Sequence, residues 1–454
     1  MSETRKTLLF GAAAVVLALL AFLMKPSQIT PDAFLDQGEA FFQDFTDPNE
    51  ATTLEVIDYD EETGSARPFK VTFTGGRWTI PSHHNYPADA EDRLAKTAAG
   101  VIDLKKDDFR TDNISNHEAC GVIDPLDESA AGLSGRGKRV TMKGKGGKLL
   151  ADFIIGHEVL ARPGFRFVRV PGQNRVYGCR VDVDISTRFE DWIDHDLLQV
   201  DKNRINGVTF KDYSINERTL SVEQRDNLIL TLNGGEWKDD RMSKTQLVDS
   251  SRMKDFLTSL DDLSIVGVRP KPDGLSASLK SDAGGVEMSQ PDRISLQQKG
   301  YYLSRDGQLL SNEGELQVHT SEGVLYTLRF GEVLYGSGLA ITAGVSEEET
   351  DKAGAAASRY LFVTAGFEKD YFGSAPPKPG NEEFRTKPDS LWTEDDKTNK
   401  DRQDKLDQWK RKVDRGREFA ESLNARFADW YYVISASSFE KLDLDRKDLV
   451  VKKE

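Results

Sequence analysis

The sequence predicts an α+β protein in which two duplicated repeats, each a mainly antiparallel sheet with a packed helix, follow an N-terminal transmembrane helix. Three observations support this prediction: one apolar run near the start, many segments that alternate as strands do, and a strand–glycine turn–helix pattern that occurs twice. With 454 residues, 38% of them hydrophobic and 30% charged, the chain can form two or more domains with sizeable cores.

The apolar run at residues 8–24 contains 17 uncharged residues, which is at the short end of what a membrane-spanning helix needs. Arg5 and Lys6 precede it and acidic residues follow it, so the positive-inside rule places the N-terminus in the cytoplasm. No A-x-A-like site follows, which favours an uncleaved signal anchor over a removed signal peptide, with later cleavage as the alternative. We therefore expect residues 1–25 to form a cytoplasmic tip and a membrane anchor, with the bulk of the chain extracytoplasmic.

Residues 26–50 are predicted to form a helical juxtamembrane segment. Apolar side chains within residues 31–45 recur at nearly helical spacing, with acidic residues between them. A helix that lies on a membrane usually carries Lys or Arg on its polar face, and this segment has neither. Packing on the first domain is therefore the favoured interpretation.

The first repeat is expected at residues 51–205. Residues 54–59, 69–74 and 77–80 have the alternation of a three-stranded meander, with Gly75 and Gly76 in the second turn. A helix should begin at Pro87, end near Gly100 and bury one apolar stripe. The stripe is Ala90, Leu94, Ala98 and Val101.

The second repeat is expected at residues 206–454. Residues 71–104 match residues 230–263 without a gap at a shift of 159 positions, and both stretches contain Gly-Gly-x-Trp before a helix with the same apolar phase. Asp249 or Ser250 should cap the second helix. The repeated structural motif is Gly75, Gly76 and Trp78 in one copy and Gly234, Gly235 and Trp237 in the other.

The remaining parts of the repeats also read as strands and short helices. Strands are expected at 139–142, 149–155, 165–170 and 176–183, then at 325–331, 359–365 and 428–435, and residues 188–200 should form a short helix anchored by Trp192 and Leu197. Ile154-Ile155-Gly156 resembles Arg329-Phe330-Gly331, and Asp191-Trp192 resembles Asp429-Trp430.

Two insertions are expected in the second repeat, near residues 346–358 and 374–405. Both are polar or charged and poor in large apolar residues, so we expect exposed or disordered loops. A helix should follow the second insertion. Its apolar stripe is Leu406, Trp409, Val413, Ala420, Leu423 and Phe427.

Trp78 and Trp237 have two interpretations. An exposed indole could stack on a sugar or a peptide, whereas a Trp that begins the return strand of a hairpin usually packs on the next helix. The second, structural role is favoured, because both copies keep the Gly-Gly-x-Trp unit while their loops differ.

The two cysteines, Cys120 and Cys179, lie well beyond the apolar run, where an oxidising compartment would permit a disulfide between them. Two buried free thiols are the alternative. The formal net charge of −15 argues against general nucleic-acid binding, since phosphate neutralisation needs a basic surface.

No motif predicts catalysis, a cofactor or a metal. Gly132, Gly137 and Lys138 match the spacing of a phosphate-binding loop, but Arg139 replaces the metal-binding Ser or Thr and a strand is predicted to follow, so we expect no nucleotide site. His83, His84 and His117 cluster only loosely, and the equivalents of the first two are Met242 and Ser243. His157 and Glu158 lack the second histidine of HExxH, and neither cysteine lies in a nucleophile motif.

A single anchor, a Phe-containing segment after it, strands leading to GGRW and GGEW, and the segment FEDWIDHDLL together resemble the bacterial family called domain of unknown function 4340. The resemblance implies an envelope protein of the inner membrane, commonly encoded beside components of gliding-motility-type ABC transporters. It implies no catalytic residues. We therefore expect a non-enzymatic, membrane-anchored accessory or scaffold subunit with protein partners in an ABC-type transport complex, or alternatively an extracytoplasmic module that binds a glycan or a peptide.

Overall fold

The structure is a computed structural model that describes residues 11–18, 36–62, 64–130, 132–183, 185–216, 219, 221–280, 289–304, 307–336, 338–344 and 357–453. Residues 11–18, inside the predicted anchor, are helical, and the rest of the anchor lies outside the described residues. No helix among the described residues combines the length and the apolar character that crossing a membrane requires.

The chain folds into two compact units. Unit 1 contains residues up to Ile80 together with Asp89–Thr187, and unit 2 contains Pro81–Ala88 together with Arg188–Glu454. The boundary therefore falls before residue 188, whereas the sequence placed it at 205. The short helix predicted at 188–200 is largely wrong, because only the 3-10 turn η6 (Phe189–Trp192) forms in this stretch. The segment Pro81–Ala88 leaves unit 1 and packs in unit 2, which the sequence did not predict.

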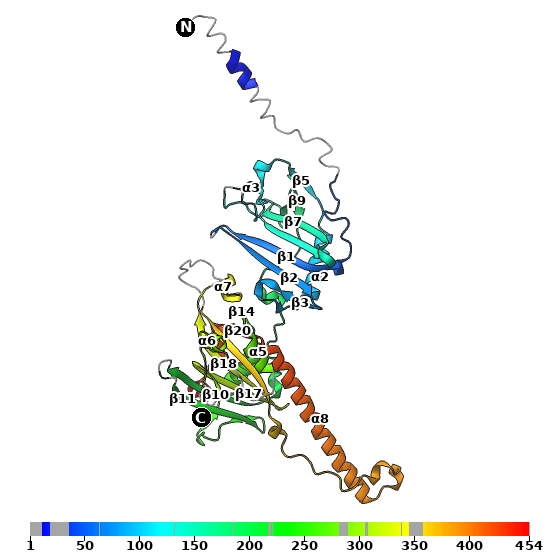
Figure 1. Ribbon diagram of the computed structural model, residues 1–454, viewed down its shortest axis with the longest axis vertical. Helices are drawn as coiled ribbons and strands as arrows, with labels where there is room; N and C mark the ends of the chain where they lie inside the picture. Colours follow the sequence, from blue (N-terminus) through cyan, green and yellow to red (C-terminus); the bar gives the residue numbers. More distant parts are fainter. Residues whose placement is uncertain are drawn as a thin grey trace. The chain divides into compact units, whose positions relative to one another are not determined.

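Unit 1 is built on an antiparallel sheet, coloured blue to cyan in Figure 1. Its strands lie in the order β3-β2-β1-β6-β7-β8-β9-β5, so β5 lies at a sheet edge although it precedes β6 to β9, the strands that separate it from β1, in the sequence. The strands are β1 (Ala51–Asp60), β2 (Ser65–Thr74), β3 (Arg77–Ile80), β5 (Asp108–Thr111), β6 (Lys138–Gly144), β7 (Leu149–Glu158), β8 (Phe165–Arg169) and β9 (Val176–Arg180). The predicted meander and the later strands are thus confirmed. The helical turns are η2 (Pro48–Glu50), η4 (Ile114–Asn116), α3 (His117–Cys120) and η5 (Lys145–Gly147).

Helix α2 (Glu91–Ile102) contacts β1 and buries the predicted stripe. It begins four residues later than predicted, because Pro87 lies in the short strand β4 (Tyr86–Pro87) and Ala90 takes the cap position. Gly100 does not end the helix but lies inside it, where an added Cβ would meet the Val183 side chain at 3.1 Å. Close packing explains this glycine.

The predicted helix at residues 31–45 is wrong for its described part, because residues 36–45 form turns and one isolated bridge. The backbone N–H of Gly38 donates to Lys106, and that of Phe41 donates to Leu104. Phe45 is buried, and the ring of Phe41 packs edge-on against Tyr177. The expectation that this segment packs on the first domain is confirmed, with hydrogen bonds to neighbouring backbone in place of helical ones.

Unit 2 has a second antiparallel sheet, with the order β12-β11-β10-β17-β18-β19-β20-β14. Each strand has a counterpart at the same place in unit 1, and again one edge strand, β14, precedes in the sequence the strands that separate it from β10. The strands are β10 (Ile205–Asn216), β11 (Ser221–Asn233), β12 (Glu236–Lys238), β14 (Gly267–Pro270), β17 (Glu313–Thr320), β18 (Val324–Leu334), β19 (Ser358–Phe367) and β20 (Trp430–Ser435).

Two small two-stranded sheets and several helices complete unit 2. The small sheets pair β13 (Gln246–Val248) with β21 (Val450–Lys452) and β15 (Tyr301–Leu303) with β16 (Leu309–Ser311). The helices are α4 (Ser250–Asp261), α5 (Asp273–Lys280), α6 (Gln290–Gln297), α7 (Gly338–Thr342), α8 (Glu394–Ala428), α9 (Ala436–Leu442) and α10 (Arg446–Leu449). Short 3-10 turns are η3 (Pro81–His83), η6 (Phe189–Trp192), η7 (Lys202–Arg204), η8 (Lys369–Phe372), η9 (Glu383–Arg385) and η10 (Asp389–Leu391). Asp249 caps α4 as predicted, with its side chain accepting from Ser251 and Arg252.

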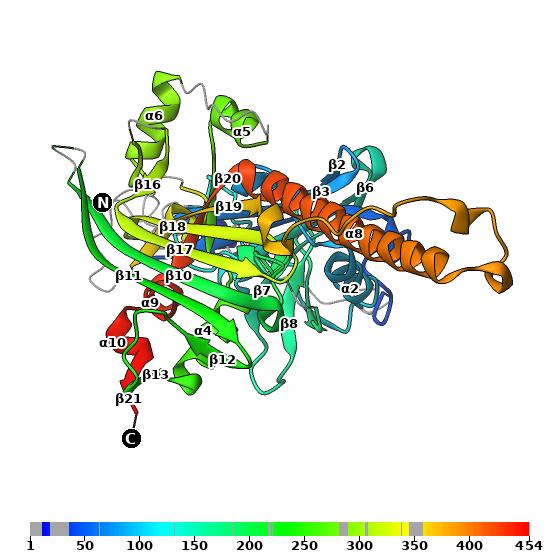
Figure 2. The ribbon, with the colours of Figure 1, turned by 90° about the horizontal axis from the view of Figure 1, so that it is seen from below.

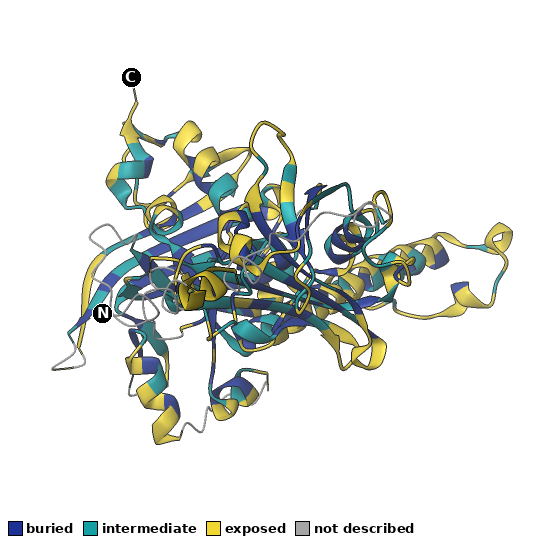
Figure 3. Cartoon of the chain, turned by 90° about the horizontal axis from the view of Figure 1, so that it is seen from above, coloured by how far each residue is buried: buried dark blue, intermediate teal, exposed yellow. Residues whose placement is uncertain are grey.

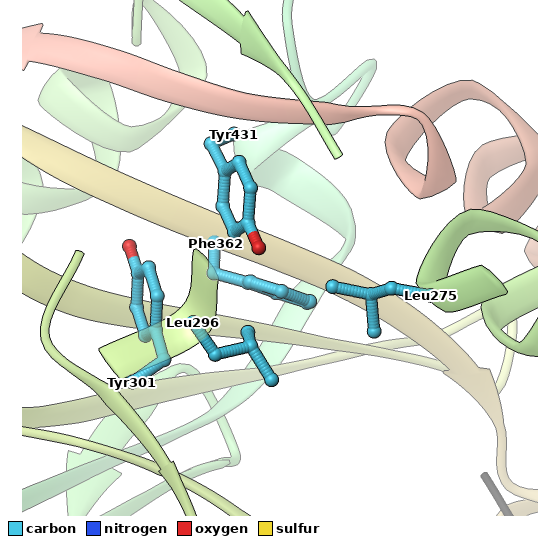
Figure 4. Close-up of a cluster of buried hydrophobic side chains, with 5 residues drawn as sticks. All are labelled: Leu275, Leu296, Tyr301, Phe362 and Tyr431. Carbon is cyan, nitrogen blue, oxygen red and sulfur yellow. The ribbon is translucent and has the colours of Figure 1, made fainter. Parts of the chain in front are cut away.

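Aromatic side chains fill one core of unit 2. Tyr301, Phe362 and Tyr431 are fully buried, and Leu275 and Leu296 from α5 and α6 pack against them (Figure 4). The rings of Tyr301 and Phe362 meet edge-on at 5.3 Å. This cluster joins the two helices to strands β19 and β20.

The prediction of an exposed or disordered loop at residues 374–405 is wrong in its last part. Helix α8 begins at Glu394, where Thr393 and Asp396 form a capping box, and it continues through the predicted apolar stripe to Ala428. The helix contacts β18 and β19, extends past the sheet, and is mostly exposed at its far end (Figures 2 and 3). The other predicted insertion, at 346–358, lies outside the described residues except for its last two positions.

Candidate binding groove

The repeated glycines form the turns that the sequence predicted. Gly75 and Gly76 have φ of 63° and 81°, and Gly234 and Gly235 have φ of 61° and 85°. Added Cβ atoms would meet nothing within 4 Å, so these positions require glycine for its backbone conformation and not for space.

Trp78 and Trp237 lie in separate units, and both are half-buried. Trp78 faces Phe73 across the hairpin, with the two rings edge-on at 5.3 Å, and Trp237 is paired with Leu232. Trp78 thus contacts its cross-strand neighbour, a contact that the sequence did not predict. This contact shows a hairpin role for Trp78.

Both cysteines are free and buried. The possible disulfide is therefore not formed, and the alternative of two buried thiols describes the structure. Burial raises the pKa of the Cys179 thiol to about 12 and also raises that of Cys120, which keeps both in the unreactive protonated form.

The histidines considered as metal ligands are not brought together. His83 and His84 belong to unit 2, where the first contacts the Thr342 hydroxyl at 2.9 Å and the second donates to the Ala343 carbonyl at 2.7 Å. His117 belongs to unit 1 and donates to the Asn174 carbonyl. In the part of the chain that the structure describes, no group of three or more His, Cys, Asp or Glu side chains is placed to hold a metal ion.

Unit 1 contains a hollow of about 830 Å³, which we name the unit 1 groove. Strand β5, the end of β7, the turn between β7 and β8, and single residues of α3, β8 and β9 form its walls. The groove is lined by Gln37, Asp108, Phe109, Arg110, Ala119, His157, Glu158, Val159, Leu160, Arg162, Phe167 and Gly178.

Glycines shape the wall around His157. Gly121 ends helix α3 with φ of 67°, and an added Cβ there would lie 2.5 Å from the His157 ring. Gly156 allows the carbonyl of Cys120 to approach β7, because a Cβ at this position would lie 2.2 Å from that oxygen. Side chains at either glycine would displace the histidine or the helix.

Leu160 is the main exposed apolar side chain of the groove, at 94% relative exposure. It stands on a hydrogen-bonded turn, in which Val159 donates to Phe165 and Arg162 donates to Val159. These hydrogen bonds hold the turn in place, while the Leu160 side chain at its tip stays in solvent. Exposing a leucine to water is unfavourable, and burying it against another molecule would be favourable.

Charged side chains surround this tip. Arg162 pairs with Asp108 and lies 3.7 Å above the ring of Phe165, while Arg110 lies 5.6 Å from the ring of Phe167. His157 and Glu158 are exposed at the end of β7. The groove thus offers one apolar anchor with donors and acceptors around it.

Residues 78–281 match the family described as a domain of unknown function, DUF4340. The DUF4340 match begins at Trp78 in β3 and ends just after α5, so it includes parts of both units and confirms the resemblance found in the sequence. A search of curated proteins gave no match, and a search of solved structures gave none either.

Sequence reasoning missed the groove. It considered His157 and Glu158 only as an incomplete metalloprotease motif, and it assigned Leu160 no role. The available signal was a large apolar residue, Leu160, two positions before Arg-Pro-Gly in the turn between two predicted strands.

Proposed function

We propose that this chain is a non-enzymatic, membrane-anchored extracytoplasmic accessory or scaffold subunit of an ABC-type transport system of the bacterial inner membrane. The observation that carries the proposal is the unit 1 groove with Leu160 held in solvent, because it suits protein contact. The apolar run at residues 8–24 supports the anchor, and the DUF4340 match supports the family setting.

The groove suits a peptide segment of a partner. Burying a leucine side chain contributes about 2 kcal/mol, and a preformed apolar anchor ringed by polar groups is the usual layout of an energetic centre in an interface. Arg110 can donate to peptide carbonyls, and Glu158 can accept from peptide N–H groups. Both are exposed beside Leu160.

A glycan is the second candidate ligand, favoured by the aromatic rings of Phe109 and Phe167 in the groove. Sugars stack on open aromatic faces, but Arg175 lies over the ring of Phe109 at 5.3 Å and Arg110 over that of Phe167. These guanidinium groups occupy one face of each ring. The peptide is therefore the better fit.

We also propose that the two units arose by duplication. The helices starting at Glu91 and Ser250 and the edge strands starting at Asp108 and Gly267 are both 159 residues apart, as the sequence match requires. Gly156 and Gly331 add a packing feature common to both sheets: a Cβ there would lie 2.2 Å from the Cys120 carbonyl and 2.1 Å from that of Lys299, respectively. The predicted match of Asp191-Trp192 with Asp429-Trp430 does not fit the duplication. Trp430 begins β20, whose counterpart in the sheet of unit 1 is β9, whereas Trp192 lies in η6.

Site-specific photocrosslinking in native membranes tests the proposed function. A benzophenone side chain replaces Leu160 in one full-length variant and Leu149 in a control, since Leu149 is a 56% exposed leucine at the other end of β7. We expect Leu160 alone to give an adduct with a transporter subunit. Adducts of equal yield from both positions, or no transporter adduct from Leu160, would overturn the proposal.

A further inference from the structure

Unit 2 has a second hollow of about 370 Å³, beside α8, which we name the α8 hollow. Its lining residues come from the middle of α8, the β17–β18 turn and the 3-10 turn η8. It is lined by Ser321, Glu322, Tyr371, Phe372, Lys412, Arg415 and Gly416. All of these residues belong to unit 2.

The fold builds this hollow around Gly416. An added Cβ at Gly416 would lie 2.2 Å from the carbonyl oxygen of Glu322, so only glycine lets the helix lie this close to the turn. The indole N–H of Trp409 donates to the carbonyl of Phe372 at 3.2 Å, which fixes η8 against the same helix. The walls are therefore held by the packing of three elements.

Three basic side chains on this side of α8 are exposed and form no ion pair with any acidic residue that the structure describes. Among the ion pairs between described residues, none includes Arg411, Lys412 or Arg415. Earlier in the helix, by contrast, Lys397, Lys400 and Lys405 each pair with an acidic residue three or four positions away. Unpaired cations are notable in a chain whose net charge is −15.

The groups around the hollow are arranged to receive an anion. The Nε of Arg415 donates to the carbonyl of Arg411, and this exposed guanidinium keeps its two terminal nitrogens for a bidentate contact. The Glu322 carboxylate is paired with Arg204 and so does not neutralise Lys412. Tyr371 accepts a hydrogen bond from Asn206, so its own hydroxyl hydrogen can be donated to a ligand.

We propose that the α8 hollow binds an acidic peptide segment of a partner protein, with a carboxylate held by Lys412 and Arg415. Such a segment can follow the hollow and avoid the exposed carboxylates of Asp414 and Glu418 on the same helix. A flat anionic membrane would meet those carboxylates as well, which opposes its binding. The inference rests on the proposed protein-contact function, but it uses a different unit from the unit 1 groove.

Fluorescence anisotropy of a labelled hexaglutamate peptide tests this inference on the full-length protein in uncharged detergent. One variant carries R411Q, K412Q and R415Q, and the matched control carries K397Q, K400Q and K405Q, which removes the same charge from the same helix. We expect the first variant to weaken binding by about tenfold or more and the control by less than about twofold. Binding by the wild type should also weaken as salt is added.

Equal weakening in both variants would overturn the inference, because it would mean that only net charge matters. So would co-sedimentation with phosphatidylglycerol vesicles that depends on the three residues, if hexaglutamate does not bind. All three side chains are exposed, and circular dichroism should show unchanged folding. The Leu160 crosslink should persist in the R411Q, K412Q and R415Q variant. The experiments therefore distinguish an error in the proposal for the α8 hollow from an error in the proposal for the unit 1 groove.

Discussion

His83 is a buried histidine that should make unit 2 sensitive to acid. It is 2% exposed, stacks on Phe189 at 4.5 Å, and burial, together with the positive charges of His84 and Arg269, lowers its pKa to about 4. The unfolded chain therefore binds more protons than the folded one between pH 6.5 and about 4, and stability falls as the pH falls through this window. We expect this residue to account for a loss of about 2 kcal/mol between pH 7 and pH 5.

The measurement is urea unfolding of the wild type and His83→Phe at both pH values. The phenylalanine can still stack on Phe189 but cannot be protonated, so the variant should lose about 2 kcal/mol less than the wild type on acidification. An identical loss in both proteins would show that His83 does not carry the pH dependence.

Lys271 is a buried lysine that completes the C-terminal end of α8. Its Nζ donates to the Phe427 carbonyl at 3.0 Å and lies 3.7 Å from the centre of the Phe362 ring, which is part of the aromatic cluster in Figure 4. Burial lowers its pKa well below the ordinary value. The amino group satisfies one of the carbonyls that a helix end leaves without a partner.

Lys271→Ala should therefore lower the free energy of unfolding by about 2–4 kcal/mol, because it leaves both a cavity and an unpaired carbonyl. Lys271→Met also removes the donor but fills the space, so its loss should be clearly smaller. Urea denaturation of the two variants separates the effect of the lost hydrogen bond from the effect of the cavity. Equal losses would assign the whole effect to the hydrogen bond.

At the scale of elements, α8 contains a glycine whose role contradicts helix propensity. Gly416→Ala in an exposed helix would stabilise by about 1 kcal/mol. Here the new Cβ would lie 2.2 Å from the Glu322 carbonyl and 2.9 Å from the Phe367 ring. We expect a loss of about 1–3 kcal/mol from overpacking, measured by thermal unfolding. Glu418→Ala, at an exposed position two residues later, should change stability by less than about 0.5 kcal/mol; a stabilising Gly416→Ala would refute the close contact.

Periodicity predicted the elements whose contacts are local. The stripe of α2, the capped start of α4 and the glycine turns at Gly75 and Gly234 follow from spacing and backbone preference alone. The start of α8 was missed because its first turns are held by a capping box and by ion pairs between charged residues, which carry no apolar period. The segment at 36–45 was predicted as a helix because its phenylalanines have helical spacing. Its backbone instead forms hydrogen bonds with residues 104–106 of unit 1.

At the scale of the whole molecule, chain order does not determine which unit a segment joins. The unit 1 groove combines β5 with the end of β7, and the α8 hollow combines residues nearly a hundred positions apart, so neither has a signature within one stretch of sequence. The HHNYP loop is the clearest case: it lies between β3 and α2 of unit 1 in sequence, yet packs in unit 2. The alternating pattern of the strands predicts the two sheets, but it does not predict that this loop packs in unit 2.

Tyr86, in that loop, provides a test of this assignment. The side chain is buried, and its ring meets Phe189 edge-on at 5.5 Å and Trp430 at 5.0 Å. Tyr86→Ala should destabilise unit 2 by about 3–5 kcal/mol, because it removes a large ring between two others. Hydrogen exchange measured by mass spectrometry should therefore become faster in β20.

The matched control is Phe153→Ala, which removes a fully buried ring from β7 in unit 1. It should speed exchange in β6 and β7 and leave β20 protected, whereas Tyr86→Ala should do the reverse, because a lost contact lowers protection first in its own cooperative unit. If Tyr86→Ala instead loosened β2 and β3, which precede it in the chain, while β20 stayed protected, residues 81–88 would belong with unit 1, and the packing of His83 on Phe189 would have to be abandoned with it.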